Sequence, residues 1–166
     1  MARRRALILP FLPKPLLEPR RAGLVIPLGW LTAIVPSLLL SGVAQWLVPN
    51  AAQPEFGATA ATTLLFLLVV FAPFVETLIM GAVLLVLLRV ASPTVAVLIS
   101  AIGWGIAHSL AVPAWGLVIW WPFLIFSTLF VVWRERSLLA AFAVPAAVHA
   151  LQNLGPALVV ASERSL

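Results

Sequence analysis

Five long runs of apolar residues dominate the chain, separated by short segments that hold charges, prolines or both. They cover residues 22–48, 58–88, 94–112, 114–133 and 138–161. A helix that spans a bilayer needs roughly 20 apolar residues, so each run predicts one transmembrane helix. The second run would measure about 46 Å as one straight helix. We therefore expect it to tilt, protrude or bend, with Pro73 as the point of bending, and we expect a kink at Pro36 in the first run.

Composition agrees with this pattern, because 63% of the 166 residues are hydrophobic and only 9% are charged. The predicted fold class is all-α: a polytopic transmembrane helix bundle of about five spanning helices, embedded in a lipid bilayer. We expect a single membrane domain over residues 22–166, with no internal repeat. The arginines lie at the ends of the runs, which argues against a nucleic-acid partner. Cysteine is absent, which excludes disulfides and thiolate chemistry.

Residues 1–21 form a basic, proline-rich tail. We expect this tail to be disordered or interfacial and held near anionic lipid by Arg3, Arg4, Arg5, Arg20 and Arg21. A cleaved presequence is the alternative. If the N-terminus is cytoplasmic, helix alternation also places Arg89, Arg134 and Arg136 on that side. The connecting segments 49–57 and 111–114, which hold no Lys or Arg, then face outward, as the positive-inside rule predicts.

Three ionisable side chains lie deep inside the apolar runs. Glu76 is 13 residues from Arg89, His108 is 14 from Thr94, and His149 is 13 from Arg136. At 1.5 Å per residue each lies about 20 Å along its helix. A polar group is costly in lipid and is expected to have a function. We therefore expect these three groups to meet, together with Asn153, which follows His149 by one helical turn.

These residue types suit hydrolysis of a peptide bond. Glu76 with His108 can activate a water molecule, and His149 with Asn153 can stabilise the oxyanion that forms on the attacked carbonyl. A zinc site with Glu76, His108 and His149 as ligands is an alternative, although the chain lacks the HExxH spacing. Each residue also has a structural interpretation: an interhelical hydrogen bond for Glu76, helix contacts for His149 and Asn153, and packing for His108.

Three short motifs, in order on successive runs, give the chain a family resemblance. They are Ala72–Thr77 (APFVET), Trp104–His108 (WGIAH) and His149–Asn153 (HALQN). This series resembles the CAAX-protease and bacteriocin-processing membrane peptidases, which are glutamic intramembrane proteases, over about residues 58–158. The resemblance implies an endopeptidase without a cofactor or metal, acting on a membrane protein or peptide in a bacterial cytoplasmic (inner) membrane. It implies Glu76 and His108 as water activators and His149 and Asn153 as oxyanion binders.

The first two motifs depart from the family pattern. Thr77 replaces the second glutamate, Gly81 replaces an arginine, and Trp104 stands where a phenylalanine is usual. The alternative function is therefore a catalytically inactive membrane scaffold or partner protein descended from such a peptidase. We expect Thr77 to bond back to a carbonyl of its own helix, as membrane threonines do.

Overall fold

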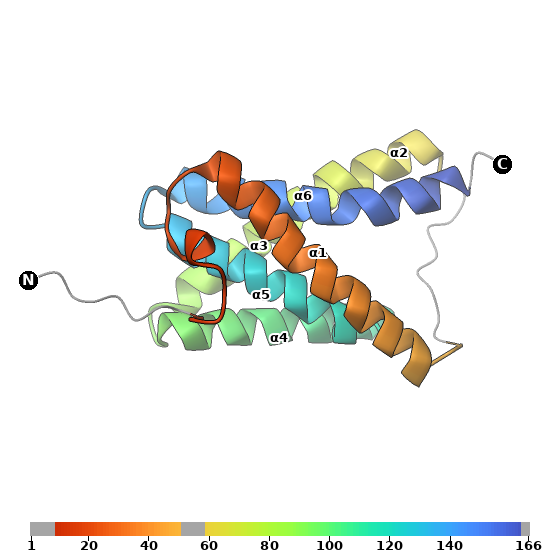
Figure 1. The fold of residues 1–166 in the computed structure, drawn as a ribbon, viewed down its shortest axis with the longest axis horizontal. Helices are drawn as coiled ribbons and strands as arrows, with labels where there is room; N and C mark the ends of the chain where they lie inside the picture. Colours follow the sequence, from red (N-terminus) through yellow and green to blue (C-terminus); the bar gives the residue numbers. More distant parts are fainter. Residues whose placement is uncertain (1–8, 51–58, 164–166) are drawn as a thin grey trace, which may run out of the picture.

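The computed structural model describes residues 9–50 and 59–163, and five helical spans make up most of this part (Figure 1). All five are long and apolar enough to cross a membrane, and the described residues form no strand. The prediction of an all-α transmembrane bundle is confirmed. The helices are α1 (Ala22–Leu47), α2 (Ala61–Phe66), η2 (Leu67–Phe71), α3 (Ala72–Leu87), α4 (Pro93–Ala111), α5 (Gly116–Trp133) and α6 (Leu138–Ser162).

Helix α5 forms the centre of the bundle. It contacts α1, α3, α4 and α6, and every residue from Pro122 to Trp133 is buried. Figure 1 shows α4 and α6 on either side of α5, with α1 crossing them diagonally. A helix that is apolar on all its faces is typical of such a buried, central position, because none of its faces needs contact with water.

Helix boundaries follow from local chemistry at two serines. The Val95 N–H donates to Ser92 Oγ (3.4 Å) at the start of α4, and the Ala140 N–H donates to Ser137 Oγ (3.0 Å) at the start of α6. In each case a serine oxygen satisfies an N–H that has no partner within the first helical turn. The residues at which α4 and α6 begin are therefore set by the serines that directly precede them.

The second span is not one regular helix. Its first half contains the π-helical turn η2, which joins α2 to α3 and ends two residues before Pro73. The structure thus has a change of helical register just before Pro73, and the expected bend at this proline stays a prediction. Helix α1, in contrast, continues without interruption across Pro36.

Part of the predicted tail belongs to the folded bundle. Residues Lys14–Leu17 form a short 3-10 helix, η1, that contacts α1 and α5. Leu9, Leu12 and Leu16 are buried in the same hydrophobic core as α5. The expected disorder is therefore wrong for residues 9–17, because three leucines supply enough apolar surface to hold the segment in place. The interfacial location of the tail stays a prediction. Arg3, Arg4 and Arg5, and most of the connecting segment 49–57, lie outside the described residues.

The cations of the described part lie at one end of the bundle. Successive spans alternate in direction, so the start of α1, the end of α3, the start of α4, the end of α5 and the start of α6 share this end (Figure 1). We call it the basic end, and its cations are Lys14, Arg20, Arg21, Arg89, Arg134 and Arg136. The cytoplasmic location of this end stays a prediction.

Candidate active site

Glu76 and His149 lie together between α3 and α6. The distance from Glu76 Oε2 to His149 Nε2 is 3.7 Å, with the glutamate side chain one-quarter exposed and the histidine side chain almost fully buried. This separation is longer than a hydrogen bond but within the range of an ion pair. Two helices distant in sequence thus bring an acid and an imidazole together in an otherwise apolar interior.

His108 is oriented by its own helix. Its Nδ1 lies 2.9 Å from the carbonyl oxygen of Trp104, one turn earlier in α4. A carbonyl only accepts, so Nδ1 carries the hydrogen and donates. In the neutral ring, Nε2 then has a free lone pair for a hydrogen bond from water or substrate.

Phenylalanines of α5 link the two histidines. The ring of Phe123 lies 5.7 Å from that of His108 and 5.3 Å from that of His149, and Phe126 stacks on His149 at 4.6 Å. Trp104 in turn stacks on Phe123 at 4.4 Å. The described contacts therefore join His108 to His149 through one shared phenyl ring, whereas the close contact of the Glu76 carboxyl group is with His149.

The sequence interpretation missed these phenylalanines. Helix α5 is apolar on all its faces, so no periodicity in it distinguishes Phe123 or Phe126 from the residues around them. A signal for their position exists only in the packed structure.

Asn153 is held by the irregular turn of the second span. In η2 the Ala72 N–H donates to the Leu67 carbonyl, five residues back. In that register the next donor would be residue 73, but proline has no N–H, so the Leu68 carbonyl loses its partner. Asn153 Nδ2 donates to this carbonyl at 3.0 Å. The half-buried amide thereby ties α6 to the turn that immediately precedes the helix carrying Glu76.

Thr77 and Gly81, two positions at which this chain departs from the family motif, are surrounded by other side chains. Thr77 is buried, and its Oγ1 has no hydrogen-bond partner among the described residues, so the predicted bond to a helix carbonyl is wrong. A Cβ at Gly81 would overlap ring carbons of Phe130 and Phe142, whose rings lie 5.0 Å apart. Two phenyl rings thus occupy the space beside the position of the motif arginine, and a long side chain would not fit there.

The zinc alternative requires about three protein ligands in one place. Within residues 9–50 and 59–163, no group of three His, Cys, Asp or Glu side chains is close enough to hold a metal ion.

Comparison with known proteins identifies one family. Residues 57–155 match a family model described as type II CAAX prenyl endopeptidase Rce1-like. The matched segment begins before α2 and ends within α6, so it includes Glu76, His108, His149 and Asn153. No curated protein and no solved structure matches the chain.

Proposed function

The chain belongs to the Rce1-like family of type II CAAX prenyl endopeptidases, and on this premise we propose that it is an intramembrane endopeptidase of the glutamic type. Membership of an endopeptidase family supports protease activity, and the five spans make the chain an integral membrane protein. The proposed substrate is a protein or peptide delivered within the membrane. The proposed location is a bacterial cytoplasmic membrane, with the basic end on the cytoplasmic side.

The proposed base is Glu76. Its carboxylate takes a proton from a water molecule, the water oxygen attacks the carbonyl carbon of the scissile bond, and the protonated carboxyl then gives its proton to the leaving amine. The observation that carries this role is the 3.7 Å approach of Glu76 and His149 inside the apolar bundle. At this separation one water molecule can contact both side chains.

His108 is the proposed partner in orienting the water. Because Nδ1 donates to the Trp104 carbonyl, Nε2 of the neutral ring is the nitrogen available to accept a hydrogen bond. The surrounding aromatic rings keep the imidazole from rotating freely, which reduces the entropy lost when the water is bound.

His149 and Asn153 are the proposed oxyanion donors. They are one turn apart on α6, so they share one face of the helix. The carboxamide of Asn153 has two N–H groups, and the bond to Leu68 uses one of them. The second N–H is available for the oxygen that becomes negatively charged in the transition state.

The test is cleavage of a farnesylated CAAX peptide, compared with the same peptide without the lipid, by the full chain in proteoliposomes. Replacing Glu76→Gln keeps the size of the side chain and removes the base, so we expect the rate to fall about a hundredfold or more. Glu135→Gln changes an acid in the connection between α5 and α6 and serves as the matched control. Cleavage by E76Q at the parental rate would end the proposal, and loss of activity on chelation would favour the zinc alternative.

The second candidate function is an inactive membrane partner protein. The motif arginine is absent, and Phe130 and Phe142 pack against Gly81 in its place. The same experiment separates the two functions. A folded parental chain that cleaves neither peptide, but binds a membrane protein that ends in the same CAAX sequence, would support the partner role.

A further inference from the structure

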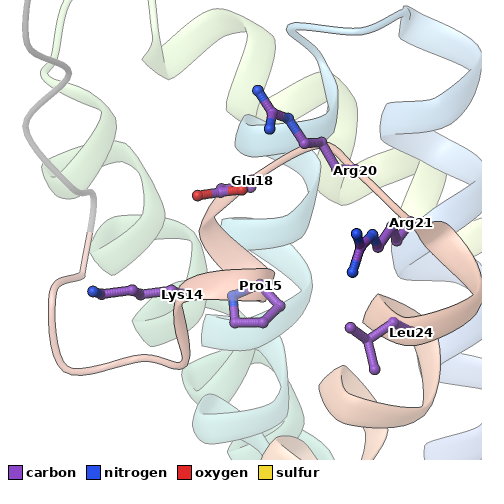
Figure 2. Close-up of a pocket in the computed structure, with 6 residues that line it drawn as sticks. All are labelled: Lys14, Pro15, Glu18, Arg20, Arg21 and Leu24. Atoms are coloured by element: carbon purple, nitrogen blue, oxygen red, sulfur yellow. The ribbon is translucent and has the colours of Figure 1, made fainter.

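A hollow of about 290 Å³ lies at the basic end, between η1 and the first turn of α1 (Figure 2). It has no residue in common with the candidate active site. Figure 2 shows Arg21 and Leu24 on the α1 side, facing Pro15 on the η1 side. The lining residues are Lys14, Pro15, Glu18, Arg20, Arg21 and Leu24.

The folded bundle holds both walls of this hollow in place. Leu16, between the lining residues of η1, is fully buried, and η1 contacts α5. On the other wall, the Leu24 and Val25 N–H groups donate to the Arg21 carbonyl at 2.8 and 3.1 Å, which fixes the backbone of Arg21 at the N-terminus of α1. The cations are therefore presented by an ordered backbone, and a ligand does not have to order a free tail in order to bind.

The lining combines charge with apolar surface. Three cations and one carboxylate leave a net charge of +2, and guanidinium and ammonium groups form strong charge-assisted hydrogen bonds to phosphate oxygens. Leu24 begins an exposed apolar stripe on α1 that continues with Leu31 and Leu38, each seven residues further on and on the same face. A phosphate in the hollow would thus lie at one end of this row of exposed leucines, Leu24, Leu31 and Leu38, which we call the apolar track.

We propose that this hollow binds the headgroup phosphate of an anionic phospholipid, with an acyl chain lying along Leu24, Leu31 and Leu38. Basic clusters beside a membrane span attract anionic lipid. Here the basic residues line a hollow, and this hollow adjoins the exposed leucines of α1. A free phosphate would use the cations alone, whereas a phospholipid also covers the leucines. The proposal does not depend on the proposed peptidase activity.

The test uses the full chain in detergent, titrated with phosphatidylglycerol and with phosphatidylcholine and followed by native mass spectrometry. We expect preferential binding of phosphatidylglycerol, weakened about fivefold by Arg21→Gln and again by Lys14→Gln, since each of these variants removes a cation that would contact the phosphate directly. Arg134→Gln removes the same charge at the same end outside the hollow and is the matched control, with affinity expected to be unchanged. Arg21→Lys keeps the charge and should retain most of the binding.

A second variant tests the apolar track. Leu31→Asn should weaken binding of phosphatidylglycerol without changing the weak binding of glycerol phosphate, because only the lipid reaches α1 beyond the hollow. Equal affinities for the two lipids would overturn the proposal. An equal loss of affinity with Arg134→Gln would also overturn it, because it would indicate non-specific electrostatic attraction. So would competition by glycerol phosphate at the same concentration as the lipid, which would indicate a site for free phosphate.

Discussion

Pro36 in α1 and Pro73 in α3 remove the same kind of backbone donor inside the membrane, yet the two spans respond differently. At Pro36 the orphaned carbonyl is that of Thr32, four residues back, and the indole of Trp121 donates to it at 2.9 Å while α1 continues as an α-helix. At Pro73 the helix passes through a π turn, and Asn153 donates to the carbonyl of Leu68. In lipid no water can satisfy these carbonyls, so a neighbouring helix must supply the donor.

The difference lies in the groups that supply the donors. The indole of Trp121 has one N–H, and the Thr32 carbonyl uses it. The carboxamide of Asn153 has a second N–H and lies one turn after His149. The missing backbone donor of the second span is thus replaced by a residue of the candidate active site, whereas the missing donor at Pro36 is replaced by Trp121, which is not one of the candidate site residues.

Among variants that test this comparison, the largest expected effect comes from Asn153→Ala. Loss of the proposed oxyanion donor should lower the cleavage rate about a hundredfold. Loss of the bond to Leu68 should also lower the free energy of unfolding by about 0.6–1.7 kcal/mol, the range for hydrogen bonds between membrane helices. Cleavage assays and unfolding in detergent measure the two effects separately.

Adding Pro73→Ala to that variant separates the two roles of Asn153. The alanine N–H can donate to the Leu68 carbonyl, so we expect stability to recover while activity stays low. Recovery of activity as well would show that Asn153 acts only by supporting the turn. Equal destabilisation by Asn153→Ala with and without Pro73 would contradict the assignment of the backbone role.

Gly81 lies in the part of α3 that follows Glu76, and we expect its substitution to change stability through packing alone. Gly81→Ala places a methyl group against Phe130 and Phe142, and we expect a loss of about 1–3 kcal/mol in the free energy of unfolding. Gly103→Ala in α4 is the control, because a Cβ there meets nothing within 4 Å and alanine favours a helix. A Gly81→Ala variant as stable as the control would show that the two rings move aside freely.

At the other proline, Trp121→Phe keeps an aromatic ring and removes the N–H. We expect a loss of about 0.6–1.7 kcal/mol, with unchanged cleavage per folded molecule. Pro36→Ala should restore the lost stability, because it returns a backbone donor to the Thr32 carbonyl. A specific loss of cleavage in the folded Trp121→Phe variant would remove the distinction between the two proline sites.

The smallest effect is expected at Thr77. Its buried Oγ1 has no partner among the described residues, so Thr77→Val should change the free energy of unfolding by no more than about 0.5 kcal/mol or increase it slightly. Thermal unfolding measures this directly. A marked loss of cleavage in a folded Thr77→Val variant would instead assign the hydroxyl a part in the reaction.

Several features of the fold and site could be predicted from short-range patterns. Run length predicted the five spans. The four-residue spacing predicted that His149 and Asn153 share a helix face. The approach of Glu76 to His149 was expected from equal depth, and these two side chains do meet. The particular partners of His108 and Asn153 were not predictable, because they depend on how neighbouring helices rotate about their axes.

The sequence by itself determined that this chain forms membrane helices, because a backbone in lipid must satisfy its own hydrogen bonds and long apolar runs leave no other arrangement. It also determined where donors would be missing, since proline lacks an N–H. Only the tertiary structure decided which side chains complete those carbonyls, that Phe123 joins the two histidines, and that Leu9, Leu12 and Leu16 enter the core. The physical reason is that apolar residues cover almost every helix face, so hydropathy does not select neighbours, and close packing and hydrogen bonding between particular side chains do.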